Sequence, residues 1–252
     1  MHVELALLGQ FDCRAGGRPL LLAPRGERLL AFLALHRRPV RRDRLFGALW
    51  ADVTEERASG NLRSTLWRLP RPEGTVLVDT ADGHVRLSDA VSVDLWGVEA
   101  RDPEGLEERL MAGDLLPGWD DEWVLAERER YRQLRLHMLE ELCDQHRDRA
   151  RYFHALRLGL AAVEVEPLRE TAHRHVMQVH LSEGNTSEAL RQYDSFRRLL
   201  HGELGLPPSP AMRALVDDVL DQPVDRPVAR WDPRPTEGAD RRRATEGVAR
   251  SA

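Results

Sequence analysis

One stretch of the chain, from about Glu56 to Leu69, carries side chains that can contact DNA bases. Its apolar residues recur at helical spacing, which predicts an amphipathic helix with one buried face. That face comprises Ala58, Leu62, Leu66 and Leu69. The opposite face holds Asn61, Arg63, Ser64, Trp67 and Arg68. Arginine pairs well with guanine and asparagine with adenine in the major groove, so this face is a candidate DNA-reading surface. A solvated helix face has a similar composition and is the alternative interpretation.

The stretch just before it predicts a second, shorter helix over Arg41 to Trp50, whose apolar side chains form one stripe. We expect this helix to pack and not to read bases. Its first residues, Arg41, Arg42 and Arg44, lie where helix-turn-helix proteins cross the DNA backbone. Phosphate contact and simple exposure are equally good interpretations of each.

The surrounding segments supply a sheet, a helix and a hairpin. Residues 2–8 alternate in polarity, and the segment Phe11 to Leu22 has a turn signal at Gly16-Gly17, so a small antiparallel sheet is predicted. A helix begins at Pro24 and ends before Pro39. Two short strand-like runs, 75–80 and 84–87, flank Ala81-Asp82-Gly83 and predict a hairpin. In this order the elements predict a winged helix, with Thr75 to Leu87 as the wing.

Two wing residues, His84 and Arg86, alternate with apolar neighbours and therefore share one strand face. They are candidates for minor-groove contact, and exposed wing residues without a role are the alternative. For Trp67 we expect packing against the wing or against helix 41–50, in preference to contact with a thymine methyl group.

From about Asp102 to Leu220 the pattern is helical with short breaks, including a long helix within Trp119 to Arg149. The triplet Ala155-Leu156-Arg157 recurs 34 residues later as Ala189-Leu190-Arg191, which is the period of tetratricopeptide helix pairs. The fold class predicted is mainly α with small β: a winged helix-turn-helix domain over 1–90 and an all-α tetratricopeptide-like domain over 91–220. The proline-rich segment 221–252 is expected to be disordered.

Charge is distributed unevenly along the chain. The net charge is −5, but residues 1–72 hold 13 Arg against 7 acids (+6), whereas residues 101–220 hold 16 Arg against 23 acids (−7). Fields act locally, so a basic domain joined to an acidic one describes the chain better than its net charge does. The chain has no lysine, which coding bias toward high G+C explains more simply than selection for arginine.

Other function classes find little support. Without lysine there is no Walker A motif, and no HExxH or Cys/His zinc spacing occurs, so we expect no enzyme, catalytic residue, cofactor or metal site. Cys13 and Cys143 offer no disulfide framework, which fits a reducing cytoplasm. No export signal or membrane-spanning run is present, so we expect a cytoplasmic protein without membrane partners.

The chain resembles the Streptomyces antibiotic regulatory proteins, activators that join an OmpR-like winged helix to a bacterial transcriptional activator domain. In the first domain the resemblance rests on Leu7-Leu8-Gly9, Arg44-Leu45-Phe46-Gly47-Ala48-Leu49-Trp50, Asn61-Leu62-Arg63 and Trp67-Arg68-Leu69. In the second it rests on Gly113-Asp114-Leu115-Leu116, Glu127-Arg128-Glu129-Arg130, Glu166-Pro167-Leu168-Arg169-Glu170, Glu188-Ala189-Leu190-Arg191-Gln192-Tyr193 and Glu203-Leu204-Gly205-Leu206-Pro207-Pro208-Ser209. It covers roughly residues 3–220.

The resemblance implies double-stranded promoter DNA with direct repeats, side-by-side protomers forming a homodimer on DNA, recruitment of RNA polymerase holoenzyme, and control of a secondary-metabolite gene cluster. In OmpR-like activators the loop matching Ala51 to Glu55 faces the polymerase, so Asp52, Glu55 and Glu56 are candidate contacts. Helix capping explains these acids equally well, because acids near a helix N-terminus complement its dipole.

The chain departs from the family pattern at the end of the candidate reading helix. Pro70 stands where a second arginine is usual, and proline disfavours helix at the residue before it. We therefore predict that the helix ends near Leu69 and that Arg71 takes over a phosphate contact. Trp67 replaces a small polar residue, and His84 replaces an aromatic one.

Two function hypotheses remain open at this point. The first is a transcription activator that binds promoter DNA through residues 1–90. The second is a protein-interaction adaptor in which the helical repeats bind a partner and the winged helix no longer reads an operator. A third, ligand sensing by the helical domain, finds no polar pocket signature in the sequence.

Overall fold

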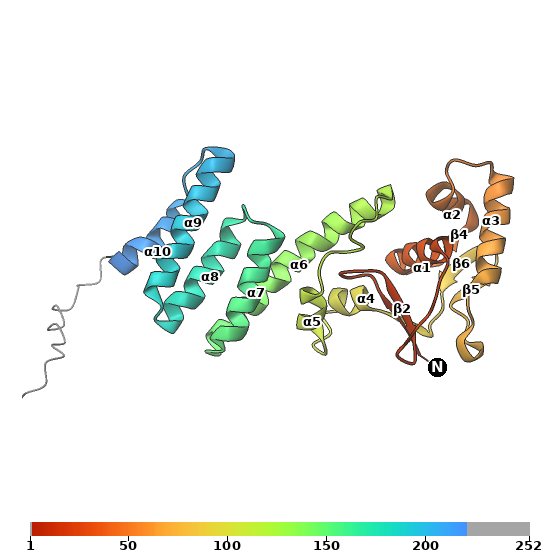
Figure 1. The fold of residues 1–252 in the computed structure, drawn as a ribbon, viewed down its shortest axis with the longest axis horizontal. Coiled ribbons are helices and arrows are strands. Elements are labelled where there is room, and N and C mark those ends of the chain that lie inside the picture. The colour runs from red at the N-terminus through yellow and green to blue at the C-terminus, as the bar shows by residue number, and fades with distance from the viewer. Residues whose placement is uncertain (1, 221–252) are drawn as a thin grey trace, which may run out of the picture.

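A computed structural model describes residues 2–220 of the protein. A small α/β unit forms the N-terminal end, and a row of helices extends from it (Figure 1). No helix among these residues is long and apolar enough to cross a membrane. The segment 221–252, for which disorder is predicted, lies outside the described residues.

The first sheet has four short strands in the order β3-β2-β1-β7. Pairing is antiparallel between β1 and β2 and between β2 and β3, as predicted for the N-terminal sheet, whereas β7 runs parallel to β1. The sequence analysis did not predict β7, because three residues are too few to show a strand period. The strands are β1 (Val3–Ala6), β2 (Asp12–Ala15), β3 (Arg18–Pro19) and β7 (Val91–Val93).

The elements between β3 and β7 form the predicted winged helix. The second sheet has the order β4-β6-β5, and the hairpin of β5 and β6 is the wing. Strand β4 was not predicted, and the wing's first strand starts at Val78 instead of Thr75, because a 3₁₀ turn at Pro72–Gly74 precedes it. The elements are α1 (Pro24–His36), β4 (Val40–Arg41), α2 (Arg42–Leu49), α3 (Glu55–Arg68), β5 (Val78–Ala81) and β6 (His84–Leu87).

The second part is a row of antiparallel helices, each packed on its predecessor from α6 onward (Figure 1). Ala155 and Ala189, the first residues of the repeated triplet, are each the fourth residue of their helix and are buried, which supports the tetratricopeptide-like pairing. The helices are α4 (Asp94–Glu99), α5 (Leu106–Met111), α6 (Glu122–Asp148), α7 (Tyr152–Val165), α8 (Glu170–Glu183), α9 (Thr186–Leu204) and α10 (Pro210–Leu220).

The segment Leu7-Leu8-Gly9 meets the segment Gly113-Asp114-Leu115-Leu116, about a hundred residues later in sequence, where the two parts of the structure join. The backbone N–H of Gly9 donates to Asp114 O at 2.7 Å, and the N–H of Leu116 donates to Leu7 O at 2.8 Å. Gly9 has φ +77°, and a Cβ there would lie 2.2 Å from the backbone oxygen of Ala112. Glycine is therefore required at this close approach. These two segments therefore join the N-terminal unit to the helical row.

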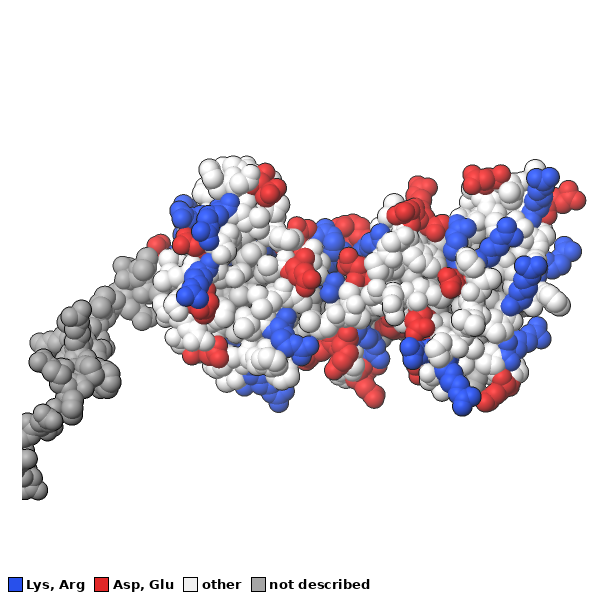
Figure 2. Space-filling model, in the orientation of Figure 1, with Lys and Arg blue, Asp and Glu red and all other residues white. Residues whose placement is uncertain are grey.

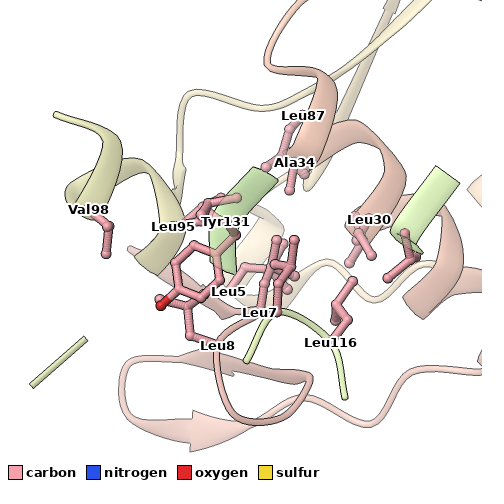
Figure 3. Close-up of a cluster of buried hydrophobic side chains, with 14 of the residues drawn as sticks. Leu5, Leu7, Leu8, Leu30, Ala34, Leu87, Leu95, Val98, Leu116 and Tyr131 are labelled. Atoms are coloured by element: carbon pink, nitrogen blue, oxygen red, sulfur yellow. The ribbon is translucent and has the colours of Figure 1, made fainter. Parts of the chain in front are cut away.

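A single apolar core runs through this junction. Leu5 of β1, Leu7 just after it and Leu30 of α1 lie in the same cluster as Leu95 of α4 and Tyr131 of α6 (Figure 3). The first sheet continues to Val93, beyond residue 90, where the sequence analysis ends the first domain. The division of the chain into domains stays a prediction, and the shared core makes the two parts one packed body.

The Asp94 carboxylate reinforces the junction by accepting backbone N–H groups. Leu7 donates at 3.0 Å, Leu8 at 3.0 Å and Leu95 at 2.7 Å. Because Asp94 follows β7 directly, these bonds hold the start of α4 against the end of β1.

Candidate DNA-binding surface

Helices α2 and α3 bury one face each and leave the other in solvent. Leu45 and Leu49 of α2 and Leu62 of α3 are buried, as the helical spacing predicts. Thr65 is also buried on α3, and its hydroxyl donates to the backbone oxygen of Asn61 at 2.8 Å. The burial of Thr65 was not predicted from the sequence, because a threonine does not count toward an apolar stripe.

The outer face of α3 presents the predicted set to solvent. Arg63, Ser64, Trp67 and Arg68 are exposed, and Asn61 is partly exposed beside them. The expectation for Trp67 was wrong: its side chain is 83% exposed and does not pack against the wing or α2. Positions 63, 64, 67 and 68 follow the helical period, so the ring shares the face of the two arginines. An exposed indole among arginines is available to contact bases.

The end of α3 confirms the effect predicted for Pro70. The last helical residue is Arg68, and Leu69 is already extended, with φ −62° and ψ 132°. A residue before proline avoids the helical region, which accounts for this ending. Arg71 follows outside the helix and is exposed. The reading segment is therefore short, and Arg71 extends the basic surface beyond it.

The arginines of residues 2–90 fall into two groups. Five lie within 4.0 Å of a carboxylate: Arg14, Arg28, Arg37, Arg41 and Arg86. The others have no acidic partner among the described residues: Arg18, Arg25, Arg38, Arg42, Arg44, Arg57, Arg63, Arg68 and Arg71. Six of these nine lie on α2, on α3 or just after α3. Figure 2 shows arginines gathered over the end of the molecule that α3 forms. The uncompensated positive charge is thus concentrated around the candidate reading helix.

The start of α2 carries other arginines that are predicted to contact the phosphates of DNA. Arg44 is exposed, and its backbone N–H donates to Asp43 at 2.8 Å. Arg41 lies 3.1 Å from the Asp43 carboxylate, but with 73% of its side chain exposed it can exchange this partner for a phosphate. Strand β4 pairs Arg41 with His84 of the wing, which places the two side by side.

The two wing residues His84 and Arg86 differ in whether their side chains are paired with carboxylates. His84 is partly exposed, and its Nδ1 lies 2.9 Å from Asp82 O. The Arg86 guanidinium lies 3.0 Å from Asp79 and 2.9 Å from Asp89, and the hydrogen bond that it donates to Asp89 is the largest of the causes that raise the pKa of Arg86. The Arg86 charge is therefore already compensated, which the sequence analysis did not anticipate.

Of the three acids predicted to contact polymerase, Asp52 lies in the loop between α2 and α3, and Glu55 and Glu56 begin α3. Asp52, Glu55 and Glu56 are all exposed. Glu55 and Glu56 occupy the first turn of α3, and the N-cap Thr54 makes no side-chain capping bond. Both interpretations of these acids, dipole complementation and partner contact, fit this geometry.

Arg25, at the start of α1, was missed by the sequence analysis. Its Nη1 donates to Oδ1 of Asn61 at 3.3 Å, which joins α1 to the outer side of α3. The contact spans 36 residues of sequence, so no local pattern could reveal it. The only available signal is that an arginine follows Pro24 in the first turn of a helix.

The first turn of α6 is anchored on the winged helix. Arg28 of α1 donates to the backbone oxygen of Leu49 at 3.2 Å, at the end of α2, and also to the Asp121 carboxylate at 2.5 Å. The ring of Trp123 meets Phe32 edge to face, with centroids 5.1 Å apart. The reading unit and the helical row are thus linked directly. No cluster of three or more metal-ligating side chains occurs among residues 2–220.

Comparison with known proteins shows which family model and which relatives the chain matches. Residues 106–220 match the family model of the bacterial transcriptional activator domain. Regulatory protein AfsR of Streptomyces coelicolor is 30% identical over 220 residues, covering 79% of this chain and 22% of the relative. The chain carries this domain and resembles the Streptomyces antibiotic regulatory proteins over most of its length. Regulatory protein AfsR of Streptomyces griseus is 26% identical over 230 residues, covering 81% of this chain and 24% of that relative. The chain spans under a quarter of the length of these relatives.

A solved structure agrees with the family fold. Mycobacterium tuberculosis EmbR in complex with low affinity phosphopeptide matches with a TM-score of 0.67 and 22% identity, over 90% of this chain and 66% of that one. At this identity the likeness concerns the fold alone. The fold class predicted from sequence, a winged helix followed by a helical domain, is confirmed.

Proposed function

We propose that the protein is a sequence-specific DNA-binding transcriptional activator that reads promoter DNA with the exposed face of α3. The observation that carries this proposal is the outward stripe of Arg63, Ser64, Trp67 and Arg68, whose arginines have no acidic partner among residues 2–220. Arginines without carboxylates, on the exposed face of the second helix of a helix-turn-helix, suit an anionic groove.

The surface divides by the kind of contact it offers. Arg63, Trp67 and Asn61 would reach base edges. Ser64, Arg68, Arg71, Arg41 and Arg44 would hold phosphates around them, which position a protein without reading sequence. On the wing, His84 is available to the minor groove, whereas Arg86 must first leave its two carboxylates.

The family resemblance supports the remaining parts of the proposal. They are direct-repeat promoter sites, a homodimer on DNA, recruitment of RNA polymerase holoenzyme in the cytoplasm, and control of an antibiotic or other secondary-metabolite gene cluster. Asp52, Glu55 and Glu56 are exposed beside the reading helix, where a polymerase bound next to the promoter would pass. Anchoring of α6 on α1 would hold the helical row in a fixed direction relative to the DNA.

The test is a footprint on DNA upstream of genes neighbouring the coding gene, followed by binding titrations at several salt concentrations. We expect protection of a repeated sequence and an affinity that falls steeply with salt, because each phosphate contact releases counterions. Arg68→Ala should weaken operator binding by about 1–3 kcal/mol. Arg213→Ala removes the same charge from exposed α10, at the far end of the molecule, and should have little effect. Salt-independent binding, or equal affinity for unrelated DNA, would contradict the proposal.

A protein-interaction adaptor is the alternative, and the acidic wing favours it. Asp79, Asp82 and Asp89 surround Arg86 and His84, so the wing does not present the net positive charge that suits a minor groove. Under this alternative Arg68→Ala would leave partner binding by the helical row unchanged, and no specific footprint would appear.

A further inference from the structure

Arg25 lies outside the helix-turn-helix yet reaches it. It occupies the first turn of α1, is exposed, and has no acidic partner among the described residues. Among residues 2–220 its guanidinium donates one side-chain hydrogen bond, from Nη1 to Oδ1 of Asn61 on α3 at 3.3 Å. That bond turns the guanidinium away from α1 and toward the reading helix.

A groove runs between the start of α1 and the second half of α3. Its volume is about 280 Å³, and Arg25 lines it from one side while Ser64 and Arg68 line it from the other. Leu22 and Leu69 are among the apolar residues that line it, and no carboxylate does. Two guanidinium groups and a hydroxyl therefore share one groove without a negative charge to balance them. Arginine forks and hydroxyl groups are the donors that bind phosphate oxygens.

We propose that Arg25 is a further DNA-binding residue, which holds one backbone phosphate together with Ser64 and Arg68 in the groove between α1 and α3. The inference rests on the proposed function and adds α1 to the surface that contacts DNA. DNA is the occupant that fits, because Ser64 and Arg68 belong both to the groove and to the outward stripe of α3. A DNA strand that lies along the exposed face of α3 would pass its phosphate backbone across this groove.

A phosphate held between two helices fixes how the reading helix lies in the major groove. Phosphate contacts set register and orientation, while base contacts supply sequence preference. The loss of Arg25 should therefore weaken binding to the operator and to unrelated DNA by similar factors. Its loss should also remove one counterion-releasing contact.

The experiment measures the salt dependence of binding to the footprinted operator for the full chain and its variants. Arg25→Ala should reduce the slope of log K against log salt by about 1. Arg18→Ala is the matched control, because Arg18 is an exposed arginine without a carboxylate partner among residues 2–220 and lies on β3 in the other sheet. It should leave the slope unchanged. Arg25→Lys keeps the charge and should retain the slope, which separates loss of the contact from misfolding.

A second measurement identifies the shared phosphate. Operators in which one phosphate is replaced by a neutral methylphosphonate should include one position at which Arg25→Ala and Arg68→Ala both lose their effect. The inference is overturned if Arg25→Ala binds like the wild type, if Arg18→Ala lowers the slope equally, or if no such common position exists. If the wild type shows no salt-dependent operator binding, the proposed function itself is contradicted. If Arg68→Ala weakens operator binding and Arg25→Ala does not, only this inference is overturned.

Discussion

Replacement of Trp67 by alanine should separate DNA binding from folding. The side chain is 83% exposed in the free protein, so its removal takes away little internal packing. The free energy of unfolding should change by no more than about 0.5 kcal/mol, as for other surface positions. Under the proposed function, bases and sugars cover the same ring in the DNA complex, and the variant loses that burial.

The size of the binding loss follows from the area of the ring. An aromatic side chain buries about 150–250 Å² when fully covered. At about 25 cal/mol per Å² this gives a ceiling of roughly 4–6 kcal/mol. Coverage of half the ring gives about 2–3 kcal/mol, which is a loss of affinity of roughly 30- to 150-fold.

Fluorescence anisotropy with labelled operator and urea denaturation would measure the two quantities on the same preparations. Phe153→Ala is the matched control, because Phe153 is 71% exposed on α7 in the other part of the molecule and should change neither quantity much. Leu62→Ala is the opposite control, because Leu62 is 2% exposed and should lose about 2–5 kcal/mol of stability. Wild-type affinity in Trp67→Ala, or its unfolding, would refute the reasoning.

Three further variants test the junction, the helical row and the wing. Asp94→Ala leaves the backbone N–H groups of Leu7 and Leu8, just after β1, without their acceptor and should cost about 1–3 kcal/mol in urea denaturation. Burial raises the pKa of Glu140, but hydrogen bonds from Arg169 and Thr171 outweigh it and hold that pKa below its ordinary value. This carboxylate therefore stabilises the fold above its unfolded pKa of about 4.3, and the stabilisation is lost as pH falls. Glu140→Gln should be less stable than the wild type near neutral pH, with a difference that shrinks as the pH falls below the unfolded pKa. A difference that grows in acid would contradict the sign. The double variant with Asp79→Asn and Asp89→Asn should free Arg86 and strengthen low-salt DNA binding by less than about 1 kcal/mol; unchanged binding would show that the wing does not approach DNA.

Local patterns predicted the elements whose causes are local. The end of α3 follows from Pro70 acting on its neighbour, and the buried faces of α2 and α3 follow from helical spacing. The hairpin turn followed from Asp82-Gly83, both of which have positive φ. The repeated Ala155 and Ala189 were likewise readable, because a close helix contact requires a small residue.

Contacts between distant segments could not be predicted in the same way. Strand β7 gains its identity only by pairing with β1, about ninety residues earlier. Arg25 joins the surface through Asn61, and Arg86 loses its freedom to two carboxylates placed by the hairpin. For Trp67 the usual burial of large apolar side chains suggested packing, although its place in the helical period pointed outward.

The most direct test of the central claim compares Arg63→Ala with the wild type on the operator and on a scrambled sequence of the same length. Arg63 lies in the middle of the outward face of α3 and has no acidic partner among residues 2–220. If α3 reads bases, the variant should lose about 1–3 kcal/mol on the operator and much less on the scrambled DNA, so that its preference collapses. Equal losses on both sequences, or none on either, would contradict the account of α3 as the reading helix.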